Sequence, residues 1–441
     1  MFKPYFIFIF CCVFCFQSFS QGNFILRKGN KDRINFKLIH NLIVIPVEIN
    51  GAKLSFLLDT GISKSIIFNF LNLREDLQIN QAESIYLRGL GEGKAVEALK
   101  SRNNVFRIGK AININQDIYA IFDPSLNFAP RLGVPIHGII GYDLLKDFVV
   151  EVNYSNKYIK LHDPDTYKPK KCKKCKSLPI EFHNNKPYII GSISINGNSK
   201  QVKLLIDSGG SDALWLFDDE DITIPDKFFE DFLGRGLSGS VYGKRSKLDK
   251  FSIAGFELKK VNVAFPDSMS VSYAKKIKDR NGSLGGEILK RFNIILDYPN
   301  SKITLKRNRF FSNPFYYNLS GITLEHNGVR MVKEIDRGSG ITRFNSNSES
   351  AGSVTVFVTN SYRYLLASAF TIVELREDSP AKNAGLKLED VILAVNNKDA
   401  HLYSLQDIIQ MFYGEDGNRI SLLIDRKGVQ LRFNFRLEKL L

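Results

Sequence analysis

Short apolar runs alternate with turn-forming residues through the first two thirds of the chain, where sustained helical periodicity is scarce. Two of these runs, 54–58 and 202–206, each follow an Asn-Gly pair, at 50–51 and 196–197. An Asn-Gly pair between apolar runs is typical of a β-hairpin turn. The pattern therefore predicts a mainly β fold for this part of the chain.

A repeat divides this β region into two halves. Segment 137–148 aligns with segment 281–292 at a constant offset of 144 (281 minus 137), and both continue into strand-like runs. Fixed self-similarity indicates duplicated structural units. We therefore expect two related lobes, at 21–165 and 179–308, joined by a basic linker at 166–178.

Each predicted lobe carries an acidic residue at the end of an apolar strand, in Asp59-Thr60-Gly61 and Asp207-Ser208-Gly209. Burying an ionised carboxylate is costly, so two equivalent buried acids call for a reason. If the lobes pair through a pseudo-twofold axis, the two carboxyl groups face each other and share one proton. Such a pair supplies a general base for water and a general acid for a leaving nitrogen, which is the chemistry of peptide-bond hydrolysis without a covalent intermediate.

These two tripeptides, each followed by an apolar-apolar-Gly element (139–141 and, with serine in its first place, 283–285), resemble the pepsin/retropepsin family of aspartic peptidases. The resemblance implies a two-lobed acid protease fold with Asp59 and Asp207 as the catalytic carboxylates and no metal or cofactor. It also implies that the Thr60 and Ser208 hydroxyls tie the active-site loops together and that Gly61 and Gly209 permit the tight turns. The family's flap, a hairpin that closes over substrate, would correspond to the glycine-rich stretch with Gly89, Gly91 and Gly93, and the second lobe has a similar stretch at 234–239.

The chain departs from the pepsin pattern next to both tripeptides. Pepsin-type enzymes usually carry serine or threonine where this chain has Ile62 and Gly210. These departures bear on efficiency and pH optimum more than on the identity of the site. A structural alternative is that both aspartates form strand-end turns in a duplicated, non-catalytic sandwich.

The C-terminal part, 315–441, resembles a PDZ domain, a β-barrel with two helices. The resemblance rests on four features in order: a strand, a Ser-Pro-Ala helix start at 379–381, an Ala-Gly-Leu sequence, and an acidic residue before another strand. Apolar spacing predicts a helix at 405–412 and closing strands at 420–424 and 429–435. In such domains a helix and an edge strand take an extended peptide as an added strand. Segment 320–324, with Gly321 and Ile322, most resembles the loop that binds a terminal carboxylate in this family. An alternative is a PDZ fold that only packs on the lobes and binds nothing. A Ser/Asn/Gly-rich surface loop is expected at 338–353.

Residues 1–20 read as a secretory signal, with one cation, an apolar block and a Ser-Phe-Ser ending. The apolar block is shorter than a bilayer span, so no integral membrane segment is expected once the signal is removed. Export to the periplasm, the cell surface or the medium is therefore expected. Of five cysteines only Cys172 and Cys175 remain after signal removal, and they are expected to form a local disulfide or to stay as free thiols in the exposed linker, because two cysteines are too few for a zinc site.

The composition is that of an ordinary globular protein, and 441 residues suggest about three folding units at roughly 150 residues each. The net charge of +15 favours solubility and acidic neighbours but does not define chemistry. Basic residues are dispersed outside the linker without aromatic interleaving, so nucleic-acid binding is not expected. The glycine-rich stretch at 89–94 has the wrong spacing for a phosphate loop, and the scattered histidines offer no metal ligand set.

The sequence thus predicts an exported single-chain aspartic endopeptidase with a polypeptide substrate and a PDZ domain that takes a peptide or C-terminal tail. Both half-sites lie in one chain, so a monomer suffices. The competing hypothesis is a non-catalytic peptide-binding or scaffold protein on the same folds. Only the peptidase needs both carboxylates.

Overall fold

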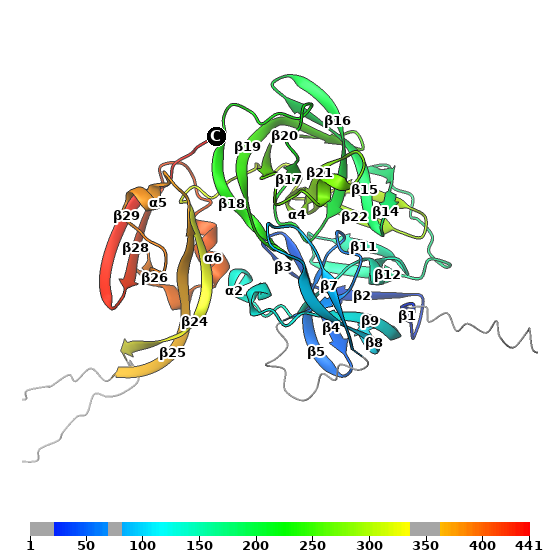
Figure 1. The fold of residues 1–441 in the computed structure, drawn as a ribbon, viewed down its shortest axis with the longest axis horizontal. Helices are drawn as coiled ribbons and strands as arrows, with labels where there is room; N and C mark the ends of the chain where they lie inside the picture. The colour runs from blue at the N-terminus through cyan, green and yellow to red at the C-terminus, as the bar shows by residue number, and fades with distance from the viewer. Residues whose placement is uncertain (1–21, 69–81, 336–361) are drawn as a thin grey trace, which may run out of the picture. The chain divides into compact units, whose positions relative to one another are not determined.

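The structure, a computed structural model, describes residues 22–68, 82–335 and 362–441 (Figure 1). The predicted signal segment 1–20 and the predicted loop 338–353 lie outside these residues. The chain divides into two compact units: one comprises 1–127, 136–229 and 233–315, and the other comprises 316–441 together with the short segments 128–135 and 230–232. The mainly β prediction is confirmed, since strands dominate both units.

The first lobe is built on one sheet that curls until β8 pairs with β9. Its hairpin β4–β5 turns at Asn50 and Gly51, which both have positive φ (51° and 97°), as the predicted Asn-Gly turn requires. The strands run in the order β1 (Ile25–Leu26), β9 (Ala111–Ala120), β6 (Ile66–Ile67), β10 (Gly138–Ile140), β5 (Ala52–Leu58), β4 (Leu42–Ile49), β8 (Val96–Ile108) and β7 (Glu83–Leu87), with β3 (Lys37–Ile39) beside β4.

The second lobe repeats this design. Its hairpin β15–β16 turns at Asn196 and Gly197, again with positive φ (49° and 81°). The strand with the acidic residue pairs in parallel with the strand of the apolar-apolar-Gly element in both lobes, β5 with β10 and β16 with β21. The order is β14 (Glu181–His183), β15 (Lys186–Ile195), β16 (Asn198–Asp207), β21 (Arg280–Gly285), β17 (Leu214–Leu216), β20 (Phe256–Pro266), β19 (Gly239–Ile253) and β18 (Phe229–Gly236).

A third, antiparallel sheet joins the two lobes. Its central pair is β11 of the first lobe with β22 of the second, so each lobe supplies half of the sheet. The order is β13 (Cys175–Pro179), β23 (Lys302–Arg307), β22 (Phe292–Asp297), β11 (Val149–Asn153), β12 (Tyr158–His162) and β2 (Lys31–Asn35). One apolar core, which includes Phe56, Phe106, Ile140, Phe251 and Phe292, runs through both lobes.

The predicted linker is structured at its end. Strand β13 begins at Cys175 and pairs with β23, and the Ser177 and Thr304 hydroxyls lie 2.8 Å apart. Cys172 forms a disulfide with Cys175, the first residue of this strand, which decides between the two predicted states of these cysteines. The unpaired edge of β23 supplies the pairing partner, and local composition did not reveal it.

The helices of the two lobes are short and lie between strands in the chain. No described helix is long and apolar enough to cross a membrane. These helices are η1 (Pro124–Leu126), α3 (Tyr142–Leu145), η2 (Ala274–Lys276) and α4 (Gly286–Leu289).

The second unit contains a small sheet with its own apolar core, which includes Ile322, Phe370, Ile392, Phe412 and Leu422. Helix α6 (Leu405–Met411) begins with a capping box, in which the Ser404 side chain accepts from the Asp407 amide and the Asp407 side chain accepts from the Ser404 amide. The sheet order is β24 (Ile322–Ile335), β25 (Tyr362–Leu375), β26 (Val391–Val395), β28 (Arg419–Arg426) and β29 (Val429–Arg436), with β27 (Lys398–Asp399) beside β26. Its helices are α5 (Pro380–Asn383), η3 (Ala400–Leu402) and α6 (Leu405–Met411), and segment 128–135 adds α2 (Ala129–Leu132).

Candidate active site

The two predicted acids, Asp59 and Asp207, stand at equivalent ends of β5 and β16. The Asp59 amide donates to the Ile140 carbonyl of the parallel neighbour β10, and Asp207 pairs in register with Gly285 on β21. Each acidic loop is therefore anchored to the apolar-apolar-Gly element of its own lobe. The duplication places the two loops at the junction of the lobes.

Reciprocal hydrogen bonds lock the two loops together. The Thr60 hydroxyl donates to the Ile206 carbonyl (2.6 Å) and accepts from the Ser208 amide (2.9 Å). The Ser208 hydroxyl donates to the Leu58 carbonyl (2.7 Å) and accepts from the Thr60 amide (3.0 Å). Both hydroxyl side chains are buried. This is the supporting role that the sequence predicts for Thr60 and Ser208.

The glycines of the tripeptides let the carboxyl groups approach the opposite loop. The Gly61 amide donates to Asp59 Oδ1 (2.7 Å), and the Gly209 amide donates to Asp207 Oδ1 (3.1 Å). A Cβ on Gly209 would lie 2.3 Å from Asp59 Cγ, and one on Gly61 would lie 3.2 Å from Asp207 Oδ1. Each glycine thus faces the carboxylate of the other lobe.

Both carboxyl groups hold protons more tightly than a free aspartate. Burial, followed by repulsion from Asp207, raises the pKa of Asp59 to about 7. Burial also raises the pKa of Asp207, but the nearby Arg280 and Lys186 cations oppose this rise. The pair therefore keeps one proton near neutrality, and the cations favour the negative charge on Asp207.

Lys186 and Arg280 are functional-site residues that sequence reasoning missed. Arg280 is 9% exposed and donates from Nη2 to the Ser283 hydroxyl (3.0 Å) and from Nε to the Gly282 carbonyl (3.2 Å). Lys186 begins β15, and its burial lowers its pKa while the two aspartates raise it. Neither residue lies in a recognised motif, so only a comparison of equivalent positions in the two lobes could have revealed them.

The two glycine-rich stretches meet. In the candidate flap, the Gly89 amide donates to the Ser238 hydroxyl (3.1 Å), and the Gly93 amide donates to the Ser238 carbonyl (2.7 Å). The Ser238 amide in turn donates to the Leu90 carbonyl (2.9 Å). A Cβ on Gly91 would lie 2.6 Å from the Ser238 carbonyl carbon, so this close approach needs glycine. Each lobe therefore contributes one of two paired tips.

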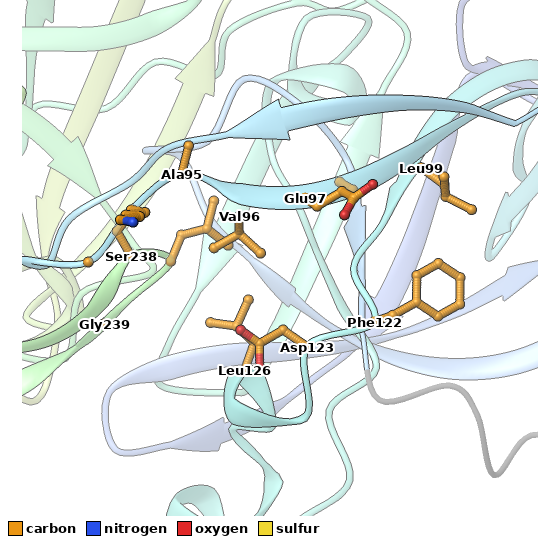
Figure 2. A pocket seen from close by; sticks show the side chains of 13 residues that line it. Ala95, Val96, Glu97, Leu99, Phe122, Asp123, Leu126, Ser238 and Gly239 are labelled. Atoms are coloured by element: carbon orange, nitrogen blue, oxygen red, sulfur yellow. The ribbon is translucent and has the colours of Figure 1, made fainter.

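A pocket of about 670 Å³ borders both tips. Figure 2 shows Val96, Phe122 and Leu126 on its apolar wall, with the carboxyl groups of Glu97 and Asp123 beside them. The second tip contributes residues 237–239. The pocket thus combines a segment of the candidate flap, the loop after β9 and the tip of the second lobe.

The candidate carboxylate loop of the C-terminal unit uses its amides internally. The Ser320 and Gly321 amides both donate to Asn318 Oδ1 (3.0 and 3.2 Å), and the Ile322 amide donates to the Ser320 hydroxyl (3.0 Å). A terminal carboxylate would need such amides as donors. Gly321 and Ile322 therefore stay a predicted carboxylate loop, and in this conformation their amides donate to Asn318 Oδ1 and to the Ser320 hydroxyl.

Among the described residues, no group of histidine, cysteine and acidic side chains could hold a metal ion.

Two family models match separate parts of the chain. A family model described as aspartyl protease matches residues 45–144, and one described as PDZ domain matches residues 371–426. Among solved structures, the aspartic proteinase from Irpex lacteus is similar with a TM-score of 0.41 and 11% identity, over 64% of this chain and 99% of that chain. No curated protein matches the chain. The match to the aspartyl protease model thus lies within the first lobe, and the match to the PDZ model lies within the C-terminal part.

Proposed function

We propose that this protein is an exported aspartic endopeptidase that hydrolyses peptide bonds with the Asp59/Asp207 pair. The observation that supports the proposal is the carboxyl pair itself, with one carboxyl group from each lobe, on loops that reciprocal hydrogen bonds join. Burial and repulsion from Asp207 raise the pKa of Asp59 to about 7, as expected for a pair that shares a proton. A duplicated scaffold without catalysis would not need two buried acids in contact, since their repulsion and desolvation destabilise the fold.

The asymmetry of the pair assigns the two roles. Asp207 lies near Arg280 and Lys186 and is the ionised partner, so it removes a proton from the attacking water. Asp59 has a pKa of about 7 and holds the shared proton, which it delivers to the substrate as the tetrahedral intermediate forms. The proton that Asp207 gained then passes to the leaving nitrogen. As the carbon–nitrogen bond breaks, Asp59 takes back a proton from a hydroxyl of the tetrahedral intermediate, so both carboxyl groups end as they began.

The substrate in this proposal is an extended polypeptide. Two paired glycine-rich tips and an apolar pocket beside them support binding of a chain with an apolar side chain in that pocket. The tips must separate for a polypeptide to enter, and glycine offers the backbone freedom for this movement.

Two observations support export. The apolar block within residues 1–20 has the form of a secretory signal. The Cys172–Cys175 disulfide is of a kind that persists in oxidising compartments and is rare in the cytosol.

The test is cleavage of an unstructured protein or a mixed peptide library across pH by the parent and by Asp59→Asn and Asp207→Asn. Both substitutions keep the side-chain shape but remove a titrating group, so each is expected to abolish cleavage. Asp226→Asn, at an exposed position, is the matched control and should keep full activity. Cleavage that survives both substitutions would place the active site elsewhere. A folded parent that cleaves nothing at any pH would favour the peptide-binding alternative.

A further inference from the structure

Segment 128–135 belongs to the second unit although it lies within the first lobe in sequence. It consists of helix α2, with Pro130 in its first turn and Gly133 in the left-handed region (φ 65°) as its end. Figure 1 shows α2 beside β24, and the two elements are in contact. The segment is thus a short, well-defined turn of helix that associates with the PDZ domain.

The contacts of this segment involve both elements that form the peptide site of a PDZ domain. On the strand side, Arg131 forms ion pairs with Glu325 on β24 (Nε to Oε1, 2.5 Å) and Glu374 on β25 (Nη2 to Oε1, 3.5 Å). On the helix side, the Gln406 amide group on α6 donates to the Leu132 carbonyl (3.0 Å). We call the surface formed by Glu325, Leu405 and Gln406 the β24–α6 face.

Further contacts secure the segment. A Cβ on Gly133 would lie 3.0 Å from Leu405 Cβ, so the end of α2 packs directly on the first turn of α6. The Arg131 guanidinium also stacks on the Phe232 ring, 4.3 Å from its centre, and Phe232 belongs to the second segment of this unit, 230–232. One arginine therefore joins both short segments to the domain.

We propose that the β24–α6 face is a docking site for the chain's own segment 128–135, so that an outside peptide binds there only by displacing it. The internally paired amides agree with this assignment, because the amides of residues 320–322 all donate to acceptors at 318 and 320 in this conformation. The occupant is a helical turn held by side chains, which differs from the added strand that PDZ domains usually take.

Chain connectivity gives this docking a consequence for the first unit. Segment 128–135 follows the pocket residue Leu126 directly and precedes β10, whose Ile140 carbonyl accepts from the Asp59 amide. Segment 230–232 lies on β18, which leads to the second glycine-rich tip. Release of the docked segment would therefore change the restraint that the chain places on the pocket wall and on the second glycine-rich tip. This consequence rests on the proposed function, whereas the docking itself does not.

The first test is hydrogen exchange of the intact protein with Arg131→Glu, which turns two ion pairs into like-charge contacts. The Leu132 and Gly133 amides, which donate to the Phe128 and Ala129 carbonyls, report on α2. We expect them to exchange about tenfold faster or more, as for loss of a partly buried ion pair. Adding Glu325→Arg should restore protection. Unchanged exchange in Arg131→Glu, or failure of the second change to restore it, would overturn the proposal.

The matched control is Arg102→Glu, which reverses the charge in another arginine–glutamate pair, with Glu83 in the first unit. It should leave exchange in the second unit unchanged. An equal loss of protection at α2 in this control would show a general effect of charge and would count against docking.

A synthetic peptide of residues 126–137 serves as the probe for competition. In the parent protein the tethered segment acts at an effective concentration in the mM range, so the free peptide should bind weakly. It should bind Arg131→Glu at least about tenfold more tightly, because the face is then open and the peptide still carries arginine. Equal affinity for both proteins, or no binding to either, would refute the proposal.

Cross-linking provides a test that does not depend on the folding of the charge variant. Cysteines at Gly133 and Leu405 should form a disulfide under mild oxidation, because the Cβ separation needs to grow only slightly to reach disulfide geometry. A control pair of Gly133→Cys with Leu388→Cys, at an exposed site, should remain unlinked. Absence of the first cross-link would mean that segment 128–135 does not dock on α6.

Discussion

Replacing Thr60 by valine should weaken the junction between the two lobes without changing the shape of the side chain. The substitution removes the hydroxyl that donates to the Ile206 carbonyl and accepts from the Ser208 amide. Because Thr60 is only 2% exposed, water cannot replace these partners without a rearrangement of the loops. The Ser208 amide is then left without its acceptor.

The expected loss follows from these two bonds. An unsatisfied buried amide costs about 1–3 kcal/mol, and loss of the bond to the Ile206 carbonyl adds about 1 kcal/mol, so unfolding should become easier by about 2–4 kcal/mol. This is a large share of a typical stability of about 5–15 kcal/mol. Thr60→Ser is the matched control, since it keeps the hydroxyl and loses only a methyl group, which costs about 1 kcal/mol.

Urea unfolding followed by tryptophan fluorescence measures the effect in the correct unit. Trp215 is the single tryptophan of the chain and lies on β17 in the second lobe, so its signal reports on the first unit and not on the second. The reasoning is refuted if Thr60→Val and Thr60→Ser unfold at free energies within about 0.5 kcal/mol of each other. That result would mean that the reciprocal hydrogen bonds contribute little to the junction.

Three further predictions concern the carboxyl pair and one buried cation. Gly209→Ala should abolish cleavage because its Cβ would lie 2.3 Å from Asp59 Cγ, whereas Gly210→Ala, whose Cβ would meet its nearest atom at 3.4 Å, should keep activity. Activity should fall as the pH rises through about 7, because Asp59 then loses the shared proton. Lys186→Gln should move this fall to higher pH, because the Lys186 cation lowers the pKa of both acids. The pH–rate profiles of the parent and of this variant check both statements. Arg291→Lys should lower the stability of the peptidase unit by about 3 kcal/mol in urea titrations, because lysine cannot replace a buried guanidinium that donates to several backbone carbonyls.

The catalytic framework could be predicted from sequence because local rules and duplication both pointed to it. The Asn-Gly turns at 50–51 and 196–197 have the positive φ values that their residue types favour. The repeat then aligned Asp59 with Asp207, and the structure brings their loops into contact. Two copies of a short motif, each with the same downstream element, carry far more information than one copy.

Pairing between distant segments could not be predicted in this way. The linker composition around 166–178 gave no sign that β13 would start at Cys175, because its partner β23 lies more than a hundred residues away. The same holds for segment 128–135, whose own residues form one turn of helix but whose association with the second unit depends on Glu325 and Gln406. The resemblance of 320–324 to a carboxylate loop likewise gave no sign that Asn318, two residues before it, accepts from the Ser320 and Gly321 amides.

The two basic residues of the site, Lys186 and Arg280, can be recognised only when equivalent strands of the two lobes are compared. The turns His40–Asn41 and Asn184–Asn185 both have positive φ, and the next residue in each lobe, Leu42 or Lys186, begins the equivalent strand. On the parallel neighbour strands, counting back from Gly141 and Gly285 pairs Ile136 with Arg280. The first lobe thus has two buried apolar residues where the second lobe has two basic ones.

In the proposed mechanism, this difference gives the two carboxyl groups of a duplicated site distinct roles. Two identical loops would give each carboxyl group an equal claim to the shared proton, so neither would be fixed as acid or base. Lys186 and Arg280 stabilise the negative charge on Asp207, while Asp59 sits against its own apolar lobe and rises to a pKa of about 7. The reciprocal hydrogen bonds of Thr60 and Ser208 are nearly symmetric, so they position both acids equally and leave the assignment of the proton to the unequal charges around them.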